Sequence, residues 1–453
     1  MQLGTDIPFP REALLQSREA QRLRISSLLS RREDLRGRVV VAFSEDDTLP
    51  ADTAFSAKRL PHGGWRLGVH VTDANEFLPV GSPLELAAGE RLAAVPGGAE
   101  MLPPGFVREV LALATGAQRP AVSVILDIDP SGSVQSVTFC ESVIRVACNF
   151  LFAELDSLST TADPSAVMPL REKYAAVYGT VVEMYELAGV LFNLRREAGG
   201  LDHTRLGRGF KDGVYSRSYE ADSRAMLREI YYFVSAAVGR FMSERGLPCL
   251  FTAQDTLQSP VAEQYCALFG IEYGGRPARI ARAAELAKGG AYFGFTCELF
   301  RQLLPDADCS AKRVYNAYAN DDRVVRFFRP TRRYSDLLML RVLKELGVRP
   351  ANREGGAMLR ARSAVDGFAS HAGRAERYIC AAEREFLLSQ ALKYCERERT
   401  ATAYVFSADG NDYGILLEYG VKAVLRSARP LRFGESVSVR VHTDGGGLSV
   451  SAP

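Results

Sequence analysis

Hydrophobic and polar positions alternate along much of the first third of the chain, which is typical of strands that bury one face. Turn-forming residues at 61–64 (Pro-His-Gly-Gly) and 129–132 (Asp-Pro-Ser-Gly) interrupt this alternation. The pattern therefore predicts two β-hairpins and one further strand. The expected strands are Val39–Phe43, Phe55–Leu60, Trp65–Thr72, Val122–Ile128 and Val134–Phe139.

A helical period of 3.6 residues replaces this alternation in the middle of the chain. An arginine-rich helix, Arg18–Arg32, is also expected near the N-terminus, with its charges on a solvated face. The other expected helices are Met168–Ala198, Ser223–Arg245, Ala278–Ala287, Arg332–Leu346 and Met358–Glu398, the last as one or two long helices.

The pattern changes back to short alternating strands at Thr400. Turns are expected at Asp409–Asp412 and Gly445–Gly447. Five strands in a segment of this length suit a small OB barrel. They are Tyr404–Ser407, Tyr413–Glu418, Lys422–Arg426, Val437–His442 and Leu448–Ser451.

Composition narrows the class of protein without naming a function. The chain has 453 residues, 47% apolar and 24% charged, as expected for a globular protein of two or more domains. A net charge of +2 means that any nucleic-acid surface must come from local clusters of Arg and Lys. The eight cysteines form no C-x-x-C pair, and the five histidines have no zinc-motif spacing. With no signal-peptide pattern at the start, we expect a soluble, cytoplasmic protein with reduced thiols.

Residues 327–336 contain three arginines in a motif that suits the binding of phosphate. Pro330 and Thr331 stand where a helix would begin, since proline is tolerated in a first turn. Backbone donors at such an end, with Arg332 and Arg333 beside them, suit a phosphate group. The alternative is a helix start with solvated arginines.

This motif resembles the signature of the ribonuclease II and ribonuclease R (RNB) family, aromatic-Thr-Ser-Pro-Ile-Arg-Arg-Tyr-x-Asp. Arg332 takes the place of the family's catalytic arginine, whereas Arg326 and Arg329 replace the usual His and Ser. Other segments resemble the family in the same order, so the resemblance covers roughly residues 8 to 453. These segments are Trp65–Asp73, Gly81–Leu84, Met101–Pro103 and Glu141–Arg145.

The resemblance implies an α/β fold: an RNB catalytic body, with a mixed β-sheet core surrounded by helices, followed by a five-stranded OB barrel. The expected domains are a lead-in helix at 1–38, an RNB-like domain at 39–397 and the barrel at 398–453. The implied partner is single-stranded RNA, and the implied cofactor is Mg²⁺. The candidate RNA-binding residues are Arg326, Arg329, Arg333, Tyr334, Tyr404 and Lys422. For the barrel residues the alternative is core packing, because aromatics that alternate in a strand are more often buried.

The family's metal-binding loop has the pattern Asp-x-x-x-x-x-Asp-x-Asp-Asp-Ala just before the Trp-Arg-Leu-Gly segment. Counting back from Trp65 without a gap places the four Asp positions on Ser44, Pro50, Asp52 and Thr53. One carboxylate can help to hold a single hydrated Mg²⁺, but two-metal hydrolysis needs a pair of ions roughly 4 Å apart. Asp52 and Arg332 are therefore the remnants of the catalytic set.

A second departure concerns the tyrosine that stacks on RNA in the family, for which this chain has Ala94. We therefore expect a protein that binds single-stranded RNA with little or no hydrolysis.

Two alternatives remain open. In a slipped register, Asp47 and its acidic neighbours Glu45 and Asp46 would join Asp52 as metal ligands, since Asp46 to Asp52 repeats the family's first spacing. The chain would then be an active 3′-to-5′ exoribonuclease. Otherwise the acidic run is a solvated loop. The last possibility is a protein-interaction scaffold that no longer binds RNA.

Overall fold

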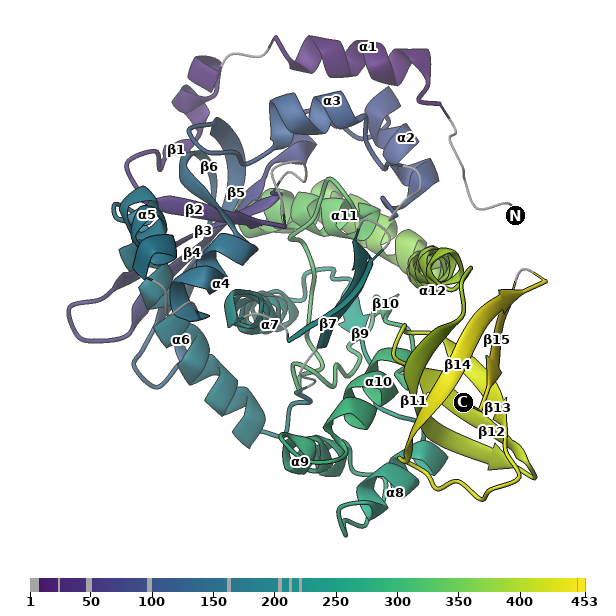
Figure 1. Ribbon diagram of the computed structural model, residues 1–453. Helices are drawn as coiled ribbons and strands as arrows, with labels where there is room; N and C mark the ends of the chain where they lie inside the picture. Colours follow the sequence, from purple (N-terminus) through teal and green to yellow (C-terminus); the bar gives the residue numbers. More distant parts are fainter. Residues whose placement is uncertain are drawn as a thin grey trace.

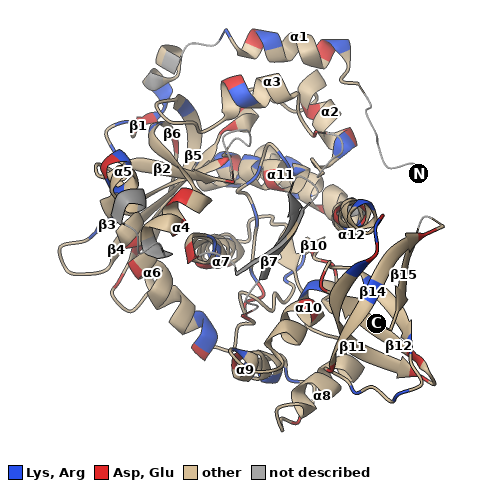
Figure 2. Cartoon of the chain, in the orientation of Figure 1, with Lys and Arg blue, Asp and Glu red and all other residues tan. Residues whose placement is uncertain are grey.

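The computed structural model describes residues 8–22, 25–45, 51–95, 100–160, 164–202, 206–211, 214–219, 222–445 and 447–452. A strongly curved sheet occupies one side of the molecule and a smaller barrel the other, with helices between them (Figure 1). Acidic and basic residues are interspersed along exposed helices such as α1 (Arg11–Ala20) (Figure 2). This distribution agrees with the near-neutral net charge.

The large sheet has six strands in the order β1-β6-β2-β3-β4-β5, and β5 pairs in turn with β6, which closes the sheet on itself. β1 and β2 run parallel to β6, and the other pairings are antiparallel. The strands are β1 (Glu33–Asp34), β2 (Val40–Ser44), β3 (Thr53–Arg59), β4 (Trp65–Thr72), β5 (Gln118–Ile128) and β6 (Val134–Leu151).

Both predicted hairpins are confirmed. β3 pairs with β4 from Thr53↔Val71 to Arg59↔Trp65 with no register shift, so the ungapped count from Trp65 back to Ala54 follows a regular hairpin. β5 pairs with β6 with one irregularity, after Asp127.

The predicted helix Arg18–Arg32 is wrong. α1 ends at Ala20, and two short 3₁₀ turns, Ile25–Ser27 and Leu29–Arg31, lead into β1. The reason lies in the fold: Arg32 is almost fully buried in ion pairs, and Glu33 then pairs with Ser142 in the sheet. A continuous helix would have kept both residues away from these partners.

The helices form a layer beside the sheet and a group between the sheet and the barrel (Figure 1). They are α2 (Pro83–Arg91), α3 (Pro104–Phe106), α4 (Phe152–Thr160), α5 (Pro164–Tyr174), α6 (Tyr178–Glu197), α7 (Asp222–Glu244), α8 (Ser259–Ala267), α9 (Pro277–Ala287), α10 (Phe293–Leu303), α11 (Tyr334–Val342) and α12 (Gly356–Tyr394). Side chains of α6, α7 and α11 such as Leu187, Val234 and Leu338 pack with Phe55 and Val69 of the sheet in the largest core.

Three helix predictions change in detail. The stretch 168–198 contains parts of two helices, α5 and α6, bent by 98°. The stretch 358–398 is mostly one 39-residue helix, α12. The helix expected from Arg332 begins at Tyr334 and continues past Val342 as a π-helical turn, Leu343–Gly347.

Short elements that sequence patterns did not predict complete the body. β7 (Leu206–Lys211) pairs with β8 (Val214–Tyr219), and β9 (Phe251–Ala253) pairs with β10 (Asp308–Ser310). Further helical turns are Ala74–Glu76, Val107–Leu111 and Pro350–Arg353.

Within the described ranges, no single helix is long and apolar enough to cross a membrane. One bent pair, Val167–Tyr174 with Tyr178–Glu197, reaches the required length and composition together.

The C-terminal segment forms a five-stranded, nearly closed barrel in the order β13-β12-β11-β14-β15. Its interior contains alternating apolar residues such as Val405, Ile415 and Val439. The strands are β11 (Arg399–Asp409), β12 (Asp412–Leu417), β13 (Lys422–Arg426), β14 (Ser436–Asp444) and β15 (Gly447–Ser451). The predicted α/β body followed by an OB-type barrel is therefore confirmed, while the domain limits at residues 38 and 397 stay predictions.

Candidate nucleic-acid interface

Residues Arg329–Arg333, which we call the arginine turn, connect a buried Phe pair to α11. The amides of Arg332 and Arg333 both donate to Arg329 O at 3.0 Å. The predicted helix start at Pro330 and Thr331 is therefore wrong, because these residues form a turn and the helix begins only at Tyr334. The backbone N–H groups of the turn are already used, so an anion at this position would be bound by guanidinium groups.

Asp52, at the start of the β3 strand, holds the turn from one side. Thr331 donates twice to it, from its amide to Oδ2 at 3.2 Å and from its hydroxyl to Oδ1 at 2.6 Å. Asp52 is 6% exposed and Thr331 3%. Burial raises the pKa of the Asp52 carboxyl, although the positive charges of Arg332 and Arg329 and the bonds from Thr331 act in the opposite direction.

The segment that follows α2 holds the turn from the other side. Ala94 N donates to Arg332 O at 2.9 Å, and Tyr334 N donates to Leu92 O at 2.8 Å. Ala93 and Arg333 form an antiparallel bridge between these bonds. Position 94, where the family resemblance expects a tyrosine, is therefore next to the arginine that the resemblance assigns to phosphate. Here it carries only a methyl group.

Two other positions of the expected metal-binding loop, Ser44 and Thr53, are engaged in protein contacts. Thr53 Oγ1 donates to Phe328 O at 2.6 Å, and Ser44 Oγ accepts from Asn149 Nδ2 at 3.1 Å. Glu45 forms an ion pair with Arg224 of α7. Pro50 and the candidate metal ligand Asp47 lie outside the described residues.

The family model of the RNB domain matches residues 32–347. This chain belongs to the RNB family. The ribonuclease R 1 of Lactococcus lactis is 23% identical over 397 residues, which cover 83% of this chain and 47% of that protein. The chain thus spans about half the length of this curated relative.

Two solved structures show the same RNB fold. RNase R of Mycoplasma genitalium in complex with ribose-methylated single-stranded RNA superposes with a TM-score of 0.84 at 12% identity, covering 100% of this chain and 76% of that one. Yeast Ssd1, described as a pseudonuclease, gives a TM-score of 0.67 at 18% identity, covering 93% and 53%.

At the pattern positions that the structure describes (44, 52 and 53), the RNB metal-binding loop offers one carboxylate, Asp52, so these positions do not fit a pair of divalent ions. Mg²⁺ prefers carboxylate oxygens that remain available to it. Here each Asp52 oxygen accepts a hydrogen bond from Thr331, and the hydroxyls of Ser44 and Thr53 are bonded to protein groups. Asp52 also belongs to no group of three candidate ligands found among the described residues.

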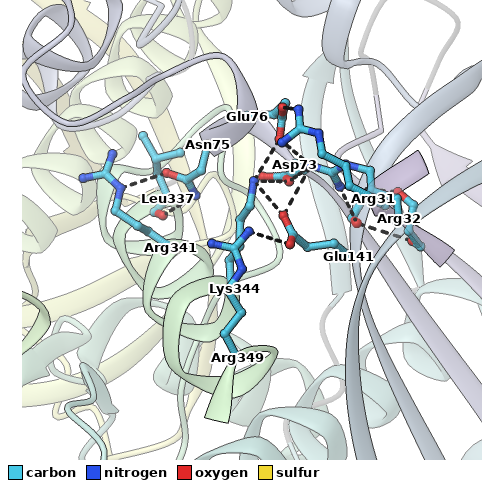
Figure 3. Close-up of polar contacts among 12 residues, drawn as sticks. Arg31, Arg32, Asp73, Asn75, Glu76, Glu141, Leu337, Arg341, Lys344 and Arg349 are labelled. Carbon is cyan, nitrogen blue, oxygen red and sulfur yellow. Dashed lines mark hydrogen bonds and ion pairs between the residues drawn. The ribbon is translucent and has the colours of Figure 1, made fainter. Parts of the chain in front are cut away.

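A separate acidic group, Asp73, Glu76 and Glu141, has ligand atoms within 4.8 Å of one another. Arg32 and Lys344 already lie inside it, and with them it forms what we call the Asp73 cluster (Figure 3). Lys344 Nζ is 2.7 Å from Asp73 and 3.2 Å from Glu141, and Arg32 Nη2 is 2.6 Å from Asp73. These cations take the place that a metal would need, so the cluster does not fit a divalent ion either.

The electrostatics of the Asp73 cluster agree with its geometry. Burial acts to raise the pKa of Glu76, but Lys344 and Arg32 outweigh burial and lower the pKa to about 2. Two cations at the rim, Arg31 and Arg349, pair with Glu76 and Glu141. Lys344 follows α11, Asp73 follows β4 and Glu141 lies in β6, so the cluster joins the end of this helical segment to the sheet (Figure 3).

Among the residues predicted to bind RNA, Arg329 is exposed, and Arg326 and Arg333 are half-buried. Arg329 and Arg332 lie near enough to Asp52 to affect its pKa. Arg326 contacts Cys309, with Nη2 4.0 Å from the sulfur. The structure thus brings Asp52, Arg329 and Arg332 together.

The predicted roles of Tyr334 and Tyr404 are not supported by their placement. Tyr334 donates its hydroxyl to Glu85, and burial and Glu85 raise its pKa to about 12. Tyr404 is 8% exposed and its ring is 6.3 Å from that of Phe295, in the core between the barrel and α10. The Tyr404 ring thus packs in this core, and the Tyr334 hydroxyl is engaged with Glu85.

Lys422 lies on the exposed side of β13. Burial of its stem and the neighbouring Arg384 lower its pKa. It remains a candidate RNA contact of the barrel, although no contact joins it to the arginine turn.

Sequence patterns missed the buried groups beneath the arginine turn. Tyr231 of α7 is half-buried, with its ring edge-on to Phe328 at 4.6 Å, and it forms a hydrogen bond with Thr53. Burial raises the pKa of Tyr231. Asp336 accepts from Arg329 N at 3.0 Å. The sequence feature that could have pointed to these contacts is Thr331, because it stands where the family pattern has Ile.

Proposed function

We propose that this RNB-family chain binds single-stranded RNA through the arginine turn and hydrolyses it weakly or not at all. One observation carries the proposal: at the four positions expected to hold metal, the chain has one carboxylate, and both of its oxygens accept hydrogen bonds from Thr331. Hydrolysis by two metals needs carboxylates that remain available to the ions.

Binding of RNA rests on the guanidinium groups of the turn. Arg329 is exposed, and Arg332 occupies the position of the family's phosphate-contacting arginine. Arginine forms paired, charge-assisted hydrogen bonds with phosphate oxygens. The relative from M. genitalium has been solved with single-stranded RNA, and yeast Ssd1 is described as a pseudonuclease. Both comparisons support the proposal by similarity of fold.

A paired assay tests the proposal on one labelled single-stranded RNA. A gel shift at several salt concentrations measures binding, and a digestion time course with and without Mg²⁺ or Mn²⁺ measures hydrolysis. We expect binding that weakens as salt rises, because phosphate contacts release counterions. Arg332→Ala should weaken binding, whereas Arg282→Ala, at an exposed position of α9, should not.

The two alternatives give different results in the same assay. Metal-dependent shortening of the RNA that Asp52→Asn abolishes would identify an active exoribonuclease. Absence of binding even at low salt would identify a protein that has lost its RNA function. Either result overturns the proposal.

A gain-of-function variant tests the reason for inactivity. Restoring the carboxylates and the aromatic ring together requires Ser44→Asp, Pro50→Asp, Thr53→Asp and Ala94→Tyr. We expect metal-dependent hydrolysis to appear in this variant and to disappear again on adding Arg332→Ala. The unmodified chain measured in parallel is the control.

A further inference from the structure

We infer that Asp52 is a positioning residue that, with Thr331, fixes the arginine turn, and that it does not act as a metal ligand. Its two oxygens accept one hydrogen bond each from Thr331, at 3.2 and 2.6 Å. A carboxylate that is 6% exposed is stable only where donors and positive charge surround it. The amide and hydroxyl of Thr331 supply the donors, and Arg332 and Arg329 supply the charge.

The neighbouring residue makes a parallel contact. Thr53 Oγ1 donates to Phe328 O at 2.6 Å, directly before the turn. Asp52 and Thr53 occupy the two adjacent metal-ligand positions of the family pattern, and both bind the segment that carries the arginines. The start of β3 therefore holds the arginine turn in place.

The whole turn is held by specific partners. Arg329 N donates to Asp336 at 3.0 Å, and Arg332 O and Tyr334 N pair with the segment after α2. Buried hydrogen bonds of this kind restrict a loop to one conformation, because each unmade bond would leave a polar group unsatisfied. The position of the Arg332 backbone is thus determined by contacts from three separate parts of the chain.

The residue type at position 331 is the chemical basis of this inference. The family pattern has Ile there, which offers Asp52 only a backbone amide. Threonine adds a hydroxyl that forms the shorter of the two bonds. A second donor is unnecessary if Asp52 binds a metal ion, but it stabilises the buried carboxylate if no metal ion is bound.

Hydrogen exchange of the segment 328–336 tests the inference without RNA. In Asp52→Asn and Thr331→Val, the Thr331 amide should exchange faster by roughly ten-fold or more, since a charge-assisted hydrogen bond is lost. The double variant should exchange no faster than either single variant. Thr331→Ser keeps the hydroxyl and should exchange like the unmodified protein.

The controls separate a local effect from general loosening. Asp129 accepts from the Ser131 and Ser133 amides in another turn, so Asp129→Asn should loosen that turn and leave residues 328–336 unchanged. If Asp52→Asn fails to fold, the comparison of Thr331→Val with Thr331→Ser still decides. Additive effects of the two substitutions would overturn the inference. So would protection of the segment by millimolar Mg²⁺ that Asp52→Asn removes.

A second measurement rests on the proposed function. If Asp52 positions Arg332, Asp52→Asn should reduce the salt dependence of RNA affinity by about one phosphate contact, a slope change of roughly 0.7 for a single strand. It should cause no further loss when Arg332→Ala is already present. If Asp52→Asn acted only by loosening the fold, it would lower RNA affinity both in the unmodified protein and in Arg332→Ala. If the unmodified protein does not bind RNA, the proposed function fails, while hydrogen exchange still decides the role of Asp52.

Discussion

Asp52 and the Asp73 cluster are two buried acidic sites of the same closed sheet, but they are neutralised differently. Asp52 accepts hydrogen bonds from a turn, and the positive charges of Arg332 and Arg329 favour its charged form. In the Asp73 cluster, Lys344 and Arg32 contact the carboxylates directly at 2.7 and 2.6 Å. One site fixes a backbone conformation, and the other joins a helical segment to the sheet by charge.

This difference shows that the partners of a buried carboxylate decide its role. Asp52 stands at a metal-ligand position of the family pattern, and the three carboxylates of the Asp73 cluster lie close enough together to hold an ion. The donors around Asp52 and the cations inside the Asp73 cluster remove that option in both. The comparison predicts different costs when each set of partners is removed.

The largest effect is expected for Lys344→Met. The Lys344 side chain is 11% exposed, so its loss leaves three carboxylates with Arg32 as their remaining inner partner, at a cost of roughly 3–5 kcal/mol in the free energy of unfolding. Arg349→Met is the matched control: the Arg349 side chain is 45% exposed and should contribute less than about 1 kcal/mol. Chemical denaturation measures both. Equal losses of unfolding free energy in the two variants would show that the buried Lys344 stabilises the Asp73 cluster no more than the exposed Arg349 does.

A smaller effect is expected for Thr53→Val. This substitution keeps the side-chain shape but leaves Phe328 O without its donor, at a cost of roughly 1–3 kcal/mol. Thr138→Val, at an exposed position of β6, should change stability by less than about 0.5 kcal/mol. If the two variants unfold at the same denaturant concentration, the hydrogen bond to Phe328 does not stabilise the turn.

A pH effect is expected from His70, which lies in β4 and faces hydroxyls. It contacts Ser56 at 3.0 Å and Ser123 at 2.7 Å. Burial, and then Arg38, lower its pKa from 6.5 to about 3. Because the unfolded chain takes up this proton first, the contribution of His70 is complete above pH 6.5 and is lost as pH falls toward 3.

The measurement is the free energy of unfolding between pH 6.5 and 5, above the range in which Glu76 titrates. His70 should add a slope of up to about 1.4 kcal/mol per pH unit. His70→Gln should remove this slope, whereas His62→Gln, an exposed substitution, should not. A slope that persists in His70→Gln would assign it to another group.

The smallest effect is expected from Mg²⁺. If neither acidic site binds it, millimolar Mg²⁺ should leave the melting temperature unchanged, since a ligand stabilises only the state that it binds. Addition of the same ionic strength as NaCl is the control. A rise in melting temperature that is specific to Mg²⁺ and absent in Asp52→Asn would show that Asp52 binds the ion.

Much of the fold followed from local patterns. Trp65–Thr72 was predicted with its observed limits, because both the alternation and the Pro-His-Gly-Gly turn are local signals. The N-terminal helix was placed wrongly because the burial of Arg32 depends on Asp73, which is distant in sequence. Likewise, nothing near Thr331 reveals its partner Asp52, 279 residues away. Residue types at the site were predictable from the resemblance, but their partners were not.

One long strand links the Asp73 cluster to Ser44 of the expected metal-binding loop. β6 has 18 residues, and it supplies Glu141 to the Asp73 cluster and Asn149 to Ser44, roughly 26 Å apart at about 3.3 Å per residue. Inserting a single residue between them would turn one of the two side chains to the opposite face. A change in the length of this strand is therefore tolerated only where the contacts at both ends can adjust.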